Sequence, residues 1–125
     1  MANQAFGWST ILLGLLVGLF LGLRFHREEW LGGYASLRRR LIRLAHISLI
    51  ALGILNVLFS LSGERLRLGP GTINVAAWAM MIGGGSMPIC CLLAAWRPGW
   101  RQLFAVPVLS LLLGTALVVV GVIRP

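Results

Sequence analysis

Two histidines, His26 and His46, are the side chains of this sequence best suited to carry chemistry. Each adjoins or lies within an apolar stretch long enough to cross a membrane, and the two stretches are consecutive in the chain. Two imidazoles that face each other from neighbouring helices can be the axial ligands of a b-type haem. Arg39 and Arg43 could then neutralise the haem propionates. One hypothesis is therefore a haem b held by His26 and His46, in an electron-transfer membrane subunit.

Other roles for these side chains remain open. In a variant of the haem hypothesis, the second iron ligand is one of the methionines Met80, Met81 and Met87. Alternatively, His46 forms a hydrogen bond between helices, for example to Asn74, and His26 only contacts water or lipid headgroups. In that case Arg39 and Arg43 bind lipid headgroups rather than propionates.

Sulfur is concentrated in one apolar stretch, which holds Met80, Met81, Met87, Cys90 and Cys91. Thiolate and thioether ligands suit Cu(I). These side chains do not share one narrow helix face, however, and methionine commonly fills gaps in packed interiors. The sequence therefore predicts no metal site.

One face of the second apolar stretch is polar. Its members recur at helical spacings of 3, 4 and 7 residues and are Arg39, Arg43, His46, Gly53, Asn56 and Ser60. Polar groups are costly to expose to lipid, so this face should contact the other helices or another subunit. Asn56 and Ser60 are accordingly predicted packing or partner residues. A small ion or solute channel lined by this face is an alternative function.

Glycines mark two further places. Gly14, Gly18 and Gly22 recur every four residues and predict a face on which another helix can pack closely. A run of three glycines, Gly83, Gly84 and Gly85, is followed by Pro88. Because Pro88 cannot donate a hydrogen bond to the carbonyl of residue 84, this run predicts a helix break at membrane depth.

These residues must be positioned by four apolar stretches, predicted as helices at residues 6–23, 41–61, 72–96 and 102–123. Each is long enough for a hydrocarbon core of about 30 Å. The chain has 125 residues, is 58% hydrophobic and has a mean hydropathy of +0.91, outside the range of soluble domains. We therefore predict an all-α membrane protein: one antiparallel bundle of four transmembrane helices, with a short interfacial segment between the first two.

Arginine sets the predicted orientation. The chain contains 11 Lys and Arg residues and 3 acidic residues, for a net charge of +8. Eight arginines flank the first and third connections and three lie on the opposite side. The positive-inside rule then places those two connections in the cytoplasm of a bacterium and both termini outside its inner membrane. Since the charges lie at membrane edges, we expect lipid headgroups as partners and no nucleic acid.

The sequence contains no motif that fixes an activity. The chain is similar in length to small multidrug-resistance exporters, but its first helix lacks their embedded glutamate. It is also similar in length to fluoride channels, whose threonine- and phenylalanine-rich break is absent. We therefore predict a non-enzymatic accessory or structural subunit that assembles with other membrane subunits or with itself.

Overall fold

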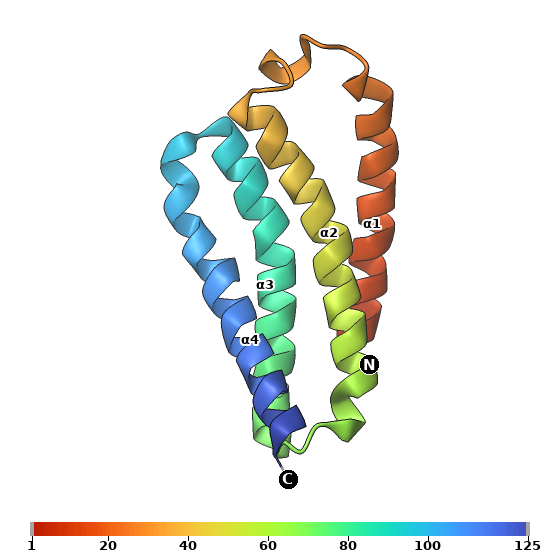
Figure 1. The fold of residues 1–125 in the computed structure, drawn as a ribbon, viewed down its shortest axis with the longest axis vertical. Coiled ribbons are helices and arrows are strands. Elements are labelled where there is room, and N and C mark those ends of the chain that lie inside the picture. Colours follow the sequence, from red (N-terminus) through yellow and green to blue (C-terminus); the bar gives the residue numbers. More distant parts are fainter. Residues whose placement is uncertain (1, 125) are drawn as a thin grey trace.

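The chain folds into four long helices in a computed structural model that describes residues 2–124. The helices are α1 (Ala2–Phe25), α2 (Leu37–Ser62), α3 (Pro70–Trp96) and α4 (Ala105–Ile123). Consecutive helices run in opposite directions (Figure 1). Each is long and apolar enough to cross a membrane. The predicted all-α architecture is therefore confirmed.

The four helices stand in chain order, and each packs mainly on its neighbours in the sequence (Figure 1). α2 and α3 hold the middle, where 39% and 44% of their apolar stretches are buried, against 17% and 11% for α1 and α4. The two edge helices consequently present wide apolar surfaces. We call the end with the α1–α2 and α3–α4 connections the arginine end, and the opposite end, with the α2–α3 connection, the terminal end.

Local signals explain where the helices begin. Ser36 precedes α2, and its side chain accepts a hydrogen bond from the backbone N–H of Arg39 at 3.2 Å. This N-cap starts α2 at Leu37, four residues before the predicted start. Pro70 occupies the first turn of α3, where a missing N–H costs nothing.

The segment predicted between the first two helices contains only one short 3₁₀ turn, Trp30–Gly32. Its backbone is unusual, because Leu31 has a φ of 57°, and Gly32 and Gly33 have φ values of 85° and 89°. A left-handed leucine persists only where the surroundings hold it firmly. What holds this turn is the side chain of Arg39, described below.

The predicted break in α3 is wrong. The helix is continuous from Pro70 to Trp96, with Pro88 inside it. Two of the glycines instead allow neighbours to approach. A Cβ on Gly83 would lie 2.5 Å from the Leu111 side chain, and one on Gly84 would lie 3.0 Å from Asn56 Nδ2. Close packing on both sides keeps the helix intact across the proline.

α4 contacts α3 through buried residues spaced seven apart, namely Pro107, Gly114 and Gly121. Gly114 lies against Met80, and Gly121 against Leu68. Met80 belongs to the buried apolar cluster of the molecule, which also contains Phe59, Leu66 and Ala76. The core therefore lies toward the terminal end, between α2, α3 and α4.

Candidate functional site

Arg39 is fully buried at the arginine end. Its guanidinium donates hydrogen bonds to three backbone carbonyls of the α1–α2 connection: to Phe25 at 2.7 Å, to Glu28 at 3.1 Å and to Arg27 at 3.3 Å. These carbonyls belong to the end of α1 and the residues after it, where acceptors lack helical partners. Arg39 therefore caps α1 from the first turn of α2.

Three aromatic rings surround the same guanidinium. Its central carbon lies 3.9 Å from the ring centre of Tyr34, 4.5 Å from that of Phe25 and 5.9 Å from that of Trp30. The Tyr34 hydroxyl also donates to the Phe25 carbonyl at 2.9 Å. Cation–π attraction strengthens when the cation is shielded from water, as it is here. We call Arg39 with these three rings the arginine cage.

The cage changes the predicted role of Arg39. Both terminal nitrogens of its guanidinium donate to the protein's own backbone, and its Nε is buried without a partner. Arg39 is therefore not available for haem propionates or lipid headgroups. Arg43, by contrast, is exposed. Arg38 resembles Arg39 rather than Arg43, because its Nε donates to the Ala95 carbonyl at 3.2 Å and its guanidinium lies 4.7 Å from the Trp96 ring centre. Arg38 thus caps α3 while Arg39 caps α1.

His46 lies between α1 and α2, with its ring on the backbone of Gly18. A Cβ on Gly18 would lie 2.6 Å from His46 Cε1. The imidazole Nδ1 is fully buried and has no hydrogen-bond partner among residues 2–124. The suggested partner Asn74 lies elsewhere, in the second turn of α3 near the terminal end. His46 therefore fills the space that Gly18 provides.

His26 and His46 are not brought together. His26 is exposed and follows the end of α1 at Phe25, whereas His46 stands at the level of Gly18. Seven helical residues separate Gly18 from Phe25, a rise of about 10 Å. Two axial ligands must reach one iron from opposite sides. Met80 does not fit the methionine variant either, because His46 packs on α1 while Met80 is buried against α4.

We therefore expect the protein purified from its native membrane to show no Soret absorbance, because its histidines do not form a shared ligand pair. The measurement is a reduced-minus-oxidised visible spectrum of the detergent-extracted protein. A b-type band at one haem per chain that disappears in His46→Ala would contradict this expectation. His26→Ala serves as the second variant, since a bis-histidine site needs both residues.

The predicted glycine face is largely right and its partner is α2. A Cβ on Gly7 would lie 2.6 Å from the Gly53 carbonyl oxygen, and one on Gly14 would lie 2.5 Å from Ile50. Together with Gly18, these residues let the two backbones approach closely. Gly22 does not take part, because nothing lies within 4 Å of its Cβ position. Toward the arginine end the two helices diverge (Figure 1).

The close contact between α1 and α2 also interrupts the polar face of α2, because α1 packs directly against its middle. Between His46 and Asn56, a Cβ on Gly53 would meet Thr10 Oγ1 at 2.6 Å and the Gly7 carbonyl oxygen at 2.8 Å. That stretch has no room for a solute, so the polar residues on either side are separated. The geometry gives the channel hypothesis no continuous polar lining.

Asn56 joins three helices near the terminal end. It is fully buried, its Oδ1 accepts from Asn3 Nδ2 at 2.9 Å, and its Nδ2 donates to the carbonyls of Leu52 and Met80 at 2.9 and 3.1 Å. Asn3 Nδ2 also donates to the Ala77 carbonyl at 3.0 Å. The predicted packing role of Asn56 thus includes a hydrogen-bonded link from α1 through α2 to α3.

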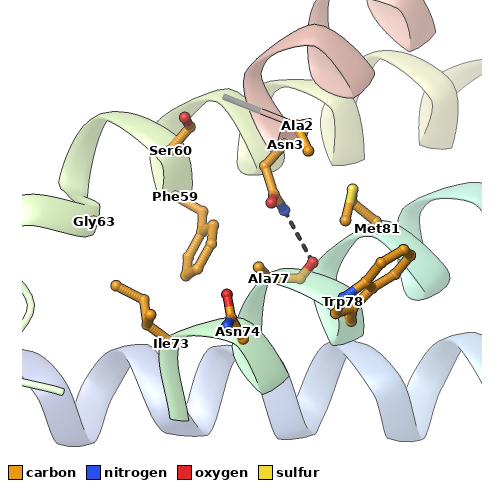
Figure 2. A pocket seen from close by; sticks show the side chains of 10 residues that line it. All are labelled: Ala2, Asn3, Phe59, Ser60, Gly63, Ile73, Asn74, Ala77, Trp78 and Met81. Carbon is orange, nitrogen blue, oxygen red and sulfur yellow. Dashed lines mark hydrogen bonds between the residues drawn. The ribbon is translucent and has the colours of Figure 1, made fainter. Parts of the chain in front are cut away.

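A cavity of about 300 Å³ adjoins this link (Figure 2). It lies between the start of α1, the end of α2 and the first turns of α3. Its polar lining comes from Asn3, Ser60 and Asn74, and its apolar lining from Ala2, Phe59, Gly63, Ile73, Ala77, Trp78 and Met81. Ser60, predicted as a packing or partner residue, therefore lines a small polar cavity.

A second hollow, of about 350 Å³, lies between α3 and α4. Its wall contains Val75, Trp78, Ala79, Ile82 and Leu113, together with the polar residues Asn74 and Ser110. We call it the α3–α4 groove. Ser110 is only partly buried and faces this groove.

Comparisons with models of known protein families, with characterised proteins and with solved structures find no match to this chain. The candidate sites therefore depend on geometry and chemistry. Sequence reasoning missed Asn3, whose signal was a carboxamide in the first turn of an apolar helix, where a buried partner such as Asn56 is needed.

Proposed function

We propose that this chain is a non-enzymatic membrane subunit that packs against a transmembrane helix of a second chain, either a different subunit or another copy of itself, through the α3–α4 groove. In this arrangement the arginine end faces the cytoplasm and both termini face the opposite side, following the arginine bias. The observation that supports the proposal is the presence of two polar side chains, Asn74 and Ser110, in an otherwise apolar groove on an exposed surface.

Lipid chains offer no hydrogen-bonding groups, whereas a partner helix can offer them. Some hydroxyl groups in the helices bond to their own backbone, as Ser48 does to the Ala45 carbonyl at 2.8 Å and Ser86 to the Ile82 carbonyl at 2.6 Å. Asn74 and Ser110 make no such bond within residues 2–124 and remain available to a partner. Trp78, with 64% of its surface exposed, adds a large apolar contact beside them.

A subunit role without catalysis is also supported by the distribution of acids. Glu28 and Glu29 lie in the α1–α2 connection, and Glu64 lies just beyond the end of α2. No acidic side chain therefore lies within α1–α4, where proton-coupled transport would use one.

The proposal predicts a specific cross-link. With a photoreactive phenylalanine analogue in place of Trp78, irradiation of the native membrane should join the chain to one partner of defined mass. Trp8 is the matched control, because it is 59% exposed but lies on α1, away from the α3–α4 groove. The analogue at Trp8 should give lipid adducts only. The measurement is mass spectrometry of the affinity-purified products.

The mass identifies the partner. A product of about twice 13.6 kDa would mean a second copy of this chain, and any other mass would mean a different subunit. Lipid adducts alone at both positions, or equal protein cross-linking at Trp8 and Trp78, would contradict assembly through the groove.

A further inference from the structure

The cavity at the terminal end presents an unused hydrogen-bond acceptor. Asn3 is only 6% exposed, and both of its side-chain hydrogen bonds use Nδ2, to Asn56 and to Ala77. Its Oδ1 accepts no hydrogen bond within residues 2–124. Arg39 Nε and His46 Nδ1 are buried side-chain atoms without a partner, but Asn3 Oδ1 is not buried in this way and remains accessible. Asn3 Oδ1 therefore opens onto the cavity that its side chain lines (Figure 2).

Two more side chains can hydrogen-bond to a molecule in the same cavity. Ser60 approaches from the end of α2 and Asn74 from the second turn of α3 (Figure 2). Neither makes a side-chain hydrogen bond within the part of the chain that the structure describes. A hydroxyl and a carboxamide both donate and accept, so the cavity can hold a carbonyl oxygen or a hydroxyl group.

The rest of the described lining favours an uncharged ligand. Among residues 2–124, no charged side chain lines the cavity, although Glu64, Arg65, Arg67 and Arg124 lie at the same end of the molecule. An anionic headgroup would leave its charge without a partner here. Phe59 and Trp78 instead provide aromatic surface, and Met81 provides a polarisable side chain. The cavity suits a neutral, flat or compact polar group.

The position of the cavity fits a ligand that arrives through the membrane. Asn3 is in the first turn of α1, and Ser60 is two residues from the last residue of α2. The cavity thus lies near the membrane surface, where the polar ends of lipids are found. At about 300 Å³ it matches the lower limit of small-molecule sites, which allows a headgroup while the tail remains in the hydrocarbon.

We infer that this cavity binds the carbonyl-bearing headgroup of a neutral membrane lipid. Two sources share this chemistry: the ring of an isoprenoid quinone and the glycerol ester of a diacylglycerol. In either case Ser60 and Asn74 donate to the carbonyl oxygens, and Trp78 and Phe59 contact the headgroup. Asn3 Oδ1 accepts from the free hydroxyl of a diacylglycerol, whereas a quinone offers only carbonyl acceptors and leaves Asn3 Oδ1 to water. Asn74 and Trp78 line both this cavity and the α3–α4 groove, whereas Asn3, Phe59 and Ser60 line the cavity alone. Ser60 therefore distinguishes lipid binding from assembly with a partner subunit.

The test is native mass spectrometry of the full chain in detergent with three probes: a decyl-tailed benzoquinone, dioctanoylglycerol and dioctanoyl phosphatidylglycerol. We expect a single adduct with the quinone, with the diacylglycerol or with both, and the adduct mass identifies the source. Ser60→Leu fills the cavity and Asn74→Leu removes a hydrogen-bonding group. Each should reduce adduct formation at a fixed probe concentration by about fivefold or more.

Ser62→Leu is the matched control, since it makes the same change two residues along α2 at a position that does not line the cavity. It should retain the adduct. Absence of an adduct with either neutral probe, stronger binding of the anionic probe, or unchanged binding in both cavity variants would overturn the inference. If one cavity variant fails to fold, as judged by circular dichroism, the other decides. Cross-linking from Trp78 in Ser60→Leu separates this result from the proposed function.

Discussion

Replacing Arg39 by glutamine should open the connection between α1 and α2. The change removes the donors that hold the carbonyls of Phe25, Arg27 and Glu28, and it empties the arginine cage. Hydrogen bonds from a charged donor contribute about 1.5–3 kcal/mol each, and they are not additive. We expect a loss of about 3 kcal/mol in the local stability of the connection, which corresponds to at least about a hundredfold faster amide exchange there.

Amide hydrogen exchange followed by mass spectrometry provides the measurement. The informative amides are those of Trp30, Gly32 and Gly33, which bond within the connection to the carbonyls of Arg27, Glu29 and Trp30. Arg40→Gln is the control, because Arg40 carries the same charge one residue along and is exposed. It should change exchange by less than threefold, since exposed substitutions usually act within about 0.5 kcal/mol. Equal exchange in the two variants would show that the cage does not hold the connection.

Arg39→Lys separates charge from geometry. Lysine keeps the positive charge, but its single ammonium lacks the planar, five-donor arrangement that reaches several carbonyls at once. We expect its exchange rates to lie much closer to those of Arg39→Gln than to the wild type. This variant belongs to the same experiment and shows why an arginine occupies the position.

The four helices were predictable because their lengths and apolar composition leave no other arrangement in a membrane. The approximate ends followed from the same argument, but the Ser36 cap, which starts α2 four residues before the predicted start, was missed. The role of Arg39 was not predictable in this way. An arginine at the start of an apolar stretch ordinarily meets headgroups, and only the fold brings the carbonyls of residues 25–28 around it.

The error in α3 has a physical cause. A proline removes one backbone hydrogen bond and crowds the preceding turn, and a run of glycines adds flexibility. Those penalties are local, whereas the packing that opposes them is tertiary. Gly83 packs against α4 and Gly84 packs against Asn56 of α2, so these two neighbouring helices hold α3 in place. The sequence signal at this position is local, so it could not show that the helix remains whole.

Adding a methyl group at Gly53 should separate α1 from α2. The new Cβ in Gly53→Ala would lie 2.8 Å from the Gly7 carbonyl oxygen and 2.6 Å from Thr10 Oγ1, and the backbone oxygen cannot rotate away. Overpacking of this kind costs about 1–3 kcal/mol, and we expect that loss in the free energy of unfolding, measured by titrating detergent-solubilised protein with SDS.

Gly22→Ala is the matched control on the same pair of helices. Its Cβ meets nothing within 4 Å, and its backbone is not left-handed. Alanine there should be neutral or stabilise the helix by up to about 1 kcal/mol, because an unfolded chain with alanine loses less conformational entropy on folding than one with glycine. The two substitutions are chemically identical, so a loss of stability in Gly53→Ala alone would establish the Gly7–Gly53 crossing as a close contact that joins α1 to α2, and equal effects would refute it.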